Sequence, residues 1–115
     1  MNESDRVRLR HMLDASREVQ DFVKGASRES LDTDLKLVRA LSMSIGIIGE
    51  AANNVSQEVC EANPQIPWRS AIAMRHFLFH AYYKVDLNVL WVTATDNVPA
   101  LMAELERLPS DNQDK

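Results

Sequence analysis

The 115-residue sequence contains little glycine, proline or cysteine, and each shortage excludes a class of protein. Three glycines and four prolines supply too few turn residues for an all-β fold, so the composition favours helices. The one cysteine, Cys60, cannot form an intramolecular disulfide and has no metal-ligand companion nearby, which predicts a reducing compartment. No apolar run approaches the roughly 20 residues that span a bilayer, and the charged N-terminus lacks the apolar core of a signal peptide. We therefore expect a cytoplasmic protein with no membrane partner.

Positive charge is also in short supply, because the formal net charge of the chain is −4. This balance argues against a general nucleic-acid coat protein, whose binding depends on neutralising phosphates. The charge is uneven, however, and residues 62–85 contain no Asp or Glu. A local basic face on an acidic protein is compatible with docking one particular polyanion. The alternative is that this window is simply apolar and low in charge. Its basic or titratable residues are Arg69, Arg75, His76, His80 and Lys84.

The remaining composition is that of an ordinary globular domain. Hydrophobic residues make up 45% of the chain and charged residues 26%, a balance that excludes a mainly disordered protein. The length is typical of one domain, and no internal repeat or change of composition marks a second one. We therefore expect a single domain over residues 1–115, with a frayed tail over residues 109–115.

Apolar residues recur at helical spacing through most of the chain. The pattern predicts a first helix over about residues 4–24, stopped by Gly25, and a long amphipathic second helix over about residues 32–61. Further helices are expected to begin at Pro67 and at Asp86, the last one kinked or restarted at Asn97 and Pro99. The predicted fold class is all-α, an up-and-down bundle of four to five helices with one long antiparallel helix pair.

Two glycines lie inside the predicted second helix, where each costs about 1 kcal/mol relative to alanine. We interpret Gly46 and Gly49 as positions where another helix approaches closely. Contact with a ligand is the alternative.

The strongest chemical signal is an arginine, Arg75, followed after four residues by His80 and two positions later by Tyr82. RNA can be cut without metal because its own 2′-hydroxyl is a nucleophile. The protein must then move protons to and from the reacting oxygens and neutralise the phosphorane. Histidine, with a reference pKa of about 6.5, can transfer the protons, and the planar fork of arginine matches phosphate oxygens. His80 is therefore the acid–base candidate and Arg75 the charge stabiliser.

Spacing alone leaves alternatives open. Arg75 and His80 would lie about 140° apart on an ideal helix, so a helix distorted near its end or a symmetric dimer is needed to bring the groups together. The catalytic hypothesis therefore requires a dimer. The pair also occurs in helices by chance, His76 is either a solvated residue or a second phosphate contact, and Tyr82 is compatible with simple packing.

The three histidines and the distant cysteine form no recognised ligand set, so we expect no metal and no cofactor.

Several separated motifs occur in a characteristic order. They are Ile47-Ile48-Gly49-Glu50-Ala51-Ala52, Ile66-Pro67-Trp68-Arg69, Met74-Arg75-His76, His80-Ala81-Tyr82-Tyr83-Lys84-Val85-Asp86, and then Trp91. From about Arg6 to Leu108 the chain closely resembles the HepT family, the ribonuclease toxin branch of the HEPN superfamily. The resemblance implies an all-helical homodimer whose Arg-x4-His-x-Tyr motifs line a shared cleft. It also implies metal-independent endoribonuclease activity on cellular RNA, either mRNA or tRNA. The implied partner is a small MntA-type nucleotidyltransferase antitoxin, which silences the toxin by adding AMP to the motif tyrosine.

Carried onto this chain, the resemblance implies that Arg75 and His80 are catalytic and that Tyr82 is the modified residue. AMP on Tyr82 would place a bulky anion beside the cationic cleft and exclude RNA by charge and volume. One departure is visible, since the residue after the motif arginine is commonly Asn in the family and here is His76, which offers a second titrating group. Glu50 matches the family's Gly-Glu-Ala element, where it either orients Arg75 or holds the helix pair together, and we favour the structural role.

Arg69 and Lys84 complete the expected set as supporting or RNA-binding residues. The main rival function is a non-catalytic helical module that binds or assists a partner nucleotidyltransferase. It shares the fold, the dimer and the partner, and differs in whether His80 performs chemistry. A plain four-helix scaffold, with the basic window as a partner surface, is the third interpretation.

Overall fold

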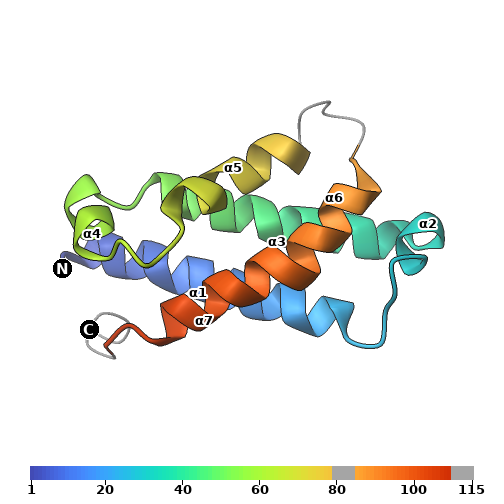
Figure 1. Cartoon of the computed structure of the whole chain (residues 1–115), viewed down its shortest axis with the longest axis horizontal. Coiled ribbons are helices and arrows are strands. Elements are labelled where there is room, and N and C mark those ends of the chain that lie inside the picture. The colour runs from blue at the N-terminus through green and yellow to red at the C-terminus, as the bar shows by residue number, and fades with distance from the viewer. Residues whose placement is uncertain (79–84, 110–115) are drawn as a thin grey trace.

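The computed structural model describes residues 1–78 and 85–109, and every regular element in this part of the chain is a helix (Figure 1). The predicted all-α class is therefore confirmed. The elements in order are α1 (Glu3–Val23), α2 (Ser30–Thr33), α3 (Leu35–Asn53), α4 (Gln57–Ala62), α5 (Trp68–Leu78), α6 (Leu87–Val92), the π-helix η1 (Thr93–Asn97) and α7 (Val98–Glu106).

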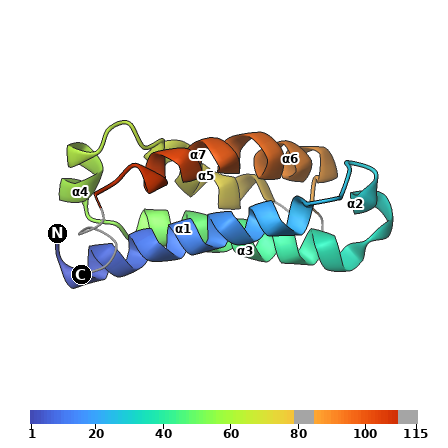
Figure 2. The same ribbon diagram turned by 90° about the horizontal axis from the view of Figure 1, so that it is seen from below.

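Four long helical runs alternate in direction along the molecule. Helices α1 and α3 form an antiparallel pair, and α5 lies against α3 (Figures 1 and 2). The fourth run, α6–η1–α7, is helical without interruption and crosses diagonally from α3 to α1. The short helices α2 and α4 lie at opposite ends of the α1–α3 pair. The up-and-down bundle with a long antiparallel pair is thus confirmed.

The hydrophobic core lies between the α1–α3 pair and the α6–η1–α7 run. Its side chains follow the helical spacing seen in the sequence, which turns one face of each helix inward. Burying one leucine or isoleucine side chain contributes about 1.5–3 kcal/mol. The fully buried large residues are Met12, Val19, Leu41, Ile45, Ile48, Ile66, Leu90, Val98, Leu101 and Leu105.

The prediction of one long helix over residues 32–61 is wrong, because the chain divides there into α2, α3 and α4. The divisions are made by polar side chains that cap the new helix ends. The Asp34 carboxylate accepts a hydrogen bond from the Leu37 backbone N–H at 3.1 Å, and the Ser56 hydroxyl accepts one from Val59 N–H at 3.3 Å. Val55 and Val59 stay buried on either side of the second break, so periodicity alone did not reveal it, whereas Leu35, just after the first break, is 63% exposed.

The second break is also held by the start of the chain. The Asp5 carboxylate, in a residue that is 3% exposed, accepts hydrogen bonds from the Ser56 backbone N–H at 2.9 Å and from the Ser56 hydroxyl at 2.7 Å. Asp5 thus ties the first turn of α1 to the N-terminus of α4.

The other predicted helix ends agree with the structure or differ by one residue. Gly25 adopts a φ of 74°, a left-handed conformation suited to glycine, two residues after α1 ends. Helix α5 begins one residue later than predicted, and the Pro67 carbonyl accepts its hydrogen bond from Ala71 N–H at 3.0 Å. Asp86 caps α6 as expected, accepting hydrogen bonds from the Asn88 and Val89 backbone N–H groups at 3.0 and 3.1 Å.

The predicted restart near Asn97 and Pro99 is present as a π-helical turn. In an α-helix, the ring of Pro99 would collide with the carbonyl four residues earlier, at Thr95. The wider turn over Thr93–Asn97 relieves this crowding, and Val98 N–H bonds to the Thr93 carbonyl five residues back. Helix α7 then holds Pro99 in its first turn, where proline is tolerated. Of the predicted frayed tail, residues 110–115 lie outside the described residues.

Candidate active site

Arg75 on α5 and Glu50 on α3 form an ion pair between Nη1 and Oε1. Their side chains are 41% and 59% exposed, so the pair lies at the surface and contributes at most about 1 kcal/mol to stability. The Glu50 carboxylate is itself oriented, because Asn54 Nδ2 donates to Oε2 at 3.3 Å and to the Glu50 carbonyl at 2.8 Å. The arrangement holds the guanidinium in one place while leaving it open to solvent.

A close helix contact fixes where the Arg75 side chain starts. A Cβ added to Gly49 would lie 3.0 Å from Arg75 Cβ, 3.2 Å from the Ala71 carbonyl and 3.4 Å from the Ile72 carbonyl. Only glycine lets α3 and α5 approach this closely, which confirms our interpretation of Gly49. The contact brings Arg75 within reach of the next residue on α3, Glu50.

Two other predicted site residues on α5 point elsewhere. His76 is exposed, and no described residue forms a hydrogen bond or ion pair with its side chain. Arg69 is also exposed and lies six positions before Arg75, which places it about 120° away around the helix. Arg69 borders a groove between α5 and the α6–η1 run rather than the Glu50 contact. The structure therefore joins Glu50 to Arg75 and leaves Arg69 apart from them.

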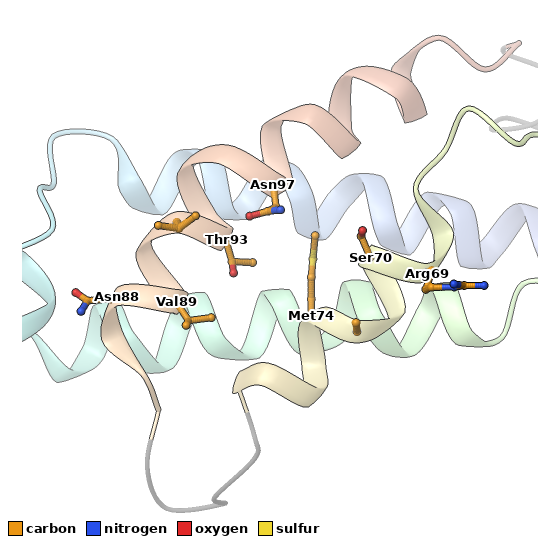
Figure 3. Close-up of a pocket in the computed structure, with 9 residues that line it drawn as sticks. Arg69, Ser70, Met74, Asn88, Val89, Thr93 and Asn97 are labelled. Atoms are coloured by element: carbon orange, nitrogen blue, oxygen red, sulfur yellow. The ribbon is translucent and has the colours of Figure 1, made fainter.

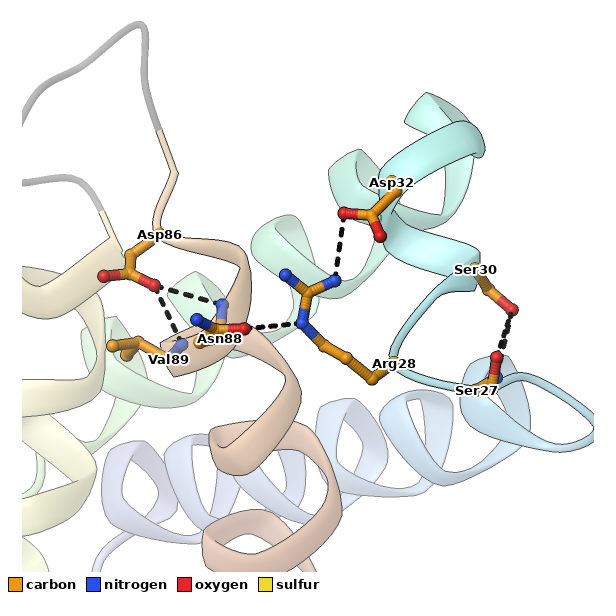
Figure 4. Close-up of polar contacts among 7 residues, drawn as sticks. All are labelled: Ser27, Arg28, Ser30, Asp32, Asp86, Asn88 and Val89. Atoms are coloured by element: carbon orange, nitrogen blue, oxygen red, sulfur yellow. Dashed lines mark hydrogen bonds and ion pairs between the residues drawn. The ribbon is translucent and has the colours of Figure 1, made fainter.

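His80, Tyr82 and Lys84 lie outside the described residues, so their roles stay predictions. The chain is firmly held where it enters α6, just after this stretch. The Arg28 guanidinium donates to the Asn88 side-chain oxygen at 2.6 Å and pairs with Asp32 at 3.1 Å (Figure 4). Together with the Asp86 cap, these contacts tie the start of α6 to the connection between α1 and α3.

A groove of 620 Å³ separates α5 from the α6–η1 run (Figure 3), within the size range of small-molecule sites. Its lining is mostly apolar, and Val92 at its border is 51% exposed. No local pattern in the sequence predicts this groove, because residues from helices that are distant along the chain form it. The lining residues are Arg69, Ser70, Ala73, Met74, Asn88, Val89, Val92, Thr93 and Asn97.

A smaller hollow of 240 Å³ lies between α1 and α3, beside the Arg75–Glu50 pair. Its polar lining includes Arg8 and His11, two residues of α1 that sequence reasoning missed. Their spacing could have indicated a shared surface, because Arg8 and His11 are three positions apart and residues at this spacing lie on one face of a helix. The other lining residues are Ile47, Glu50, Ala51 and Asn54.

The other reactive groups in the described part of the chain form no second catalytic centre. Burial raises the pKa of the Cys60 thiol, and the charges of Asp5 and Glu61 raise it further, so the thiolate nucleophile is disfavoured at neutral pH. Within residues 1–78 and 85–109, no three His, Cys, Asp or Glu side chains are grouped to hold a metal ion. In the same part of the chain, no helix has the length and apolar character needed to cross a membrane.

The fold and site define an all-helical bundle protein with a surface arginine held by a carboxylate. The family described as "Ribonuclease HepT-like" matches residues 12–108. A protein of Thermococcus cleftensis named probable ribonuclease HepT is 33% identical over 108 residues, which cover 94% of this chain and 98% of that relative. A candidate RNase of Caldanaerobacter subterraneus subsp. tengcongensis is 33% identical over 100 residues, covering 87% of this chain and 89% of the relative.

A third relative, from Methanocaldococcus jannaschii, is named as a gamma-glutamylcyclotransferase and candidate RNase. It is 29% identical over 108 residues, which cover 94% of this chain and 49% of the relative. No solved structure is a significant match. The chain belongs to the HepT-like ribonuclease family, and the resemblance stated from its motifs is confirmed.

Proposed function

We propose that this protein is a metal-independent endoribonuclease and the toxin of a toxin–antitoxin pair, cleaving cellular RNA such as mRNA or tRNA. The observation that carries the proposal is the oriented, solvent-open guanidinium of Arg75 in a chain whose relatives are named as ribonucleases. An arginine carries its charge at every working pH, and within the described residues Glu50 contacts one of the three guanidinium nitrogens of Arg75, Nη1. The other donors are left to bind phosphate oxygens.

The proposed reaction uses the RNA's own 2′-hydroxyl. Its oxygen attacks the adjacent phosphorus while the bond to the 5′-oxygen breaks, leaving a 2′,3′-cyclic phosphate and a free 5′-hydroxyl. His80 transfers a proton between these oxygens, a role typically worth about 10²–10⁴-fold in rate. Arg75 stabilises the charge that develops on the phosphorane oxygens.

A homodimer completes the proposed site, because one chain supplies few proton-transfer groups. The outer face of α3 next to Glu50 supports this arrangement. Met43, seven positions before Glu50 and so close to the same face of α3, is 66% exposed, and such an apolar side chain gains by packing against a second copy. Two copies related by a two-fold axis would bring both Arg75 residues to one cleft.

The proposed partner is an MntA-type nucleotidyltransferase that transfers AMP from ATP to the Tyr82 hydroxyl, with release of pyrophosphate and of the hydroxyl proton. The added phosphodiester is anionic and lies seven positions from Arg75 in sequence, so it would compete with RNA for the guanidinium. Mass spectrometry of the intact protein after co-expression tests this step. A gain of AMP units that disappears in Tyr82→Phe is expected, and modification at another residue would contradict it.

The direct test is expression of the chain without its partner, followed by assay of the purified dimer on RNA with a chelator present. Wild type should arrest growth and cleave RNA, while His80→Ala and Arg75→Ala should do neither. Circular dichroism should show that both variants keep their helical content. Equal toxicity of the alanine variants would reject the mechanism.

A second candidate function is a non-catalytic module that binds a nucleotidyltransferase. The groove between α5 and α6–η1, with exposed Val92 at its border, favours this candidate as a partner surface. The same assay separates the two functions, because a binding module would leave RNA intact.

A further inference from the structure

We infer that Arg8 and His11 on α1 form a second phosphate-binding subsite for the RNA strand, across α3 from Arg75. This inference rests on the proposed ribonuclease function and extends its substrate contacts to a helix outside the motif. The subsite is the 240 Å³ hollow between α1 and α3.

The hollow adjoins the catalytic arginine through a single side chain. Glu50 lines the hollow and at the same time contacts Arg75, so the guanidinium lies directly beyond its rim. Arg8 and His11 line the opposite side, from α1. A strand bound at Arg75 therefore needs to cross only the width of α3 to reach them.

The side chains of Arg8 and His11 are available for a ligand. Arg8 is partly exposed and His11 is exposed. Within residues 1–78 and 85–109, neither side chain forms a hydrogen bond or ion pair with another residue. A guanidinium with no acidic partner keeps its full capacity to bind an anion.

Local charge also favours an anion at this place. Glu50 is the one acidic residue among those named as lining the hollow, and its carboxylate is already engaged by Arg75 and Asn54. Arg75 balances the charge of Glu50, so the positive charge of Arg8 is left without a carboxylate among the lining residues. The whole chain carries −4, so this corner is a local positive site on an acidic protein.

The size and lining of the hollow point to a phosphodiester rather than a base or a cofactor. Its volume is below the roughly 300–1,000 Å³ of sites that enclose a small molecule. Ile47 and Ala51 supply an apolar floor against which a ribose can lie, while Arg8 and His11 supply N–H donors for the phosphate oxygens. Phosphate contacts of this kind position a strand and carry no sequence preference.

The test compares Arg8→Ala with Lys24→Ala, which removes an exposed positive charge from the other end of the same helix. Binding of a short fluorescein-labelled single-stranded RNA of mixed sequence is followed by anisotropy at several salt concentrations. Cleavage of the same RNA gives KM and kcat. Arg8→Ala should raise Kd and KM about fivefold to tenfold and leave kcat unchanged. It should also reduce the slope of log K against log salt by about 0.7. Lys24→Ala should match wild type.

Further variants separate the subsite from a structural effect. Arg8→Lys keeps the charge and should recover most of the affinity, whereas His11→Ala should weaken binding less than Arg8→Ala. If wild type cleaves RNA and Arg8→Ala has wild-type KM and salt slope, the subsite is overturned and the ribonuclease proposal stands. Equal losses in Lys24→Ala and Arg8→Ala would also overturn the subsite. A wild-type protein that neither binds nor cleaves RNA would overturn both proposals.

Discussion

The Cβ of Arg75 lies 3.0 Å from the position that a Cβ on Gly49 would occupy. The backbone of α3 at Gly49 thus packs directly against the Cβ of Arg75, the arginine proposed to stabilise the transition state. The Glu50 carboxylate then holds the far end of the same side chain. Backbone packing and a surface ion pair together determine where the positive charge lies.

Gly49→Ala should lower both stability and RNA cleavage. The new methyl group would also meet two α5 carbonyl oxygens at 3.2 and 3.4 Å, which cannot move without shifting the helix. Overpacking of this kind costs about 1–3 kcal/mol, partly offset by the roughly 1 kcal/mol gained when a helical glycine becomes alanine. We expect a net loss of up to about 2 kcal/mol in urea denaturation and a lower kcat.

Gly25→Ala is the matched control for this prediction. A methyl group there meets nothing within 4 Å, but the φ of 74° disfavours alanine by about 1–2 kcal/mol. It should therefore lose similar stability and keep the wild-type kcat. Equal loss of kcat in both variants would mean that activity follows stability rather than the α3–α5 contact.

Glu50→Ala should reduce kcat with little effect on stability. Its ion pair with Arg75 is half-exposed, so the free energy of unfolding should change by less than about 1 kcal/mol. Loss of the partner frees the guanidinium to adopt other rotamers, and misplaced catalytic groups typically cost about 10²-fold. Glu50→Gln retains an oxygen acceptor and should restore part of kcat. Steady-state cleavage kinetics give the comparison, and an unchanged kcat in Glu50→Ala would reject a positioning role.

Asp5→Ala should destabilise the protein by about 2–3 kcal/mol, because it leaves two donors of the half-buried Ser56 without their charged acceptor. The substitution removes the hydrogen bonds that join α1 to α4, at a position where Asp5 is 3% exposed. Thermal or urea denaturation measures it. Glu3→Ala, which removes an exposed carboxylate from the same helix turn, should change stability by less than about 0.5 kcal/mol. Similar effects of the two substitutions would contradict the assigned role of Asp5.

Cys60 should react slowly with iodoacetamide at about pH 8, more slowly than a thiol with the reference pKa of about 8.5. Burial and the nearby charges of Asp5 and Glu61 raise the pKa of the thiol, so less thiolate is present at that pH. The rate should continue to rise with pH beyond the point at which glutathione reaches its plateau. Mass spectrometry of the folded protein follows the reaction, and a rate equal to that of glutathione would contradict the raised pKa.

Helical periodicity predicted the core and most helix positions, because each helix turns one apolar face inward. It did not predict the division of residues 32–61, since the Asp5–Ser56 contact that supports the second break joins residues 51 positions apart. The same limit applies to the site. Arg75 was identified from local spacing, but its contact with Glu50 spans 25 positions, and Arg8 and His11 acquire a common surface with Glu50 only when α1 packs on α3.

The direction of the helices also determines where a neighbouring domain can be attached. Helix α1 begins at the end of the bundle where α4 lies, and α7 ends towards that same end, whereas α5 ends and α6 begins away from it (Figure 1). A domain fused before Glu3 or after α7 would therefore extend from the α4 end of the bundle, away from the end of α5 and the start of α6. The relative from Methanocaldococcus jannaschii that is named for two activities is matched by this chain over 49% of its length. Purification tags and reporter domains placed at either terminus should be tolerated for the same geometric reason.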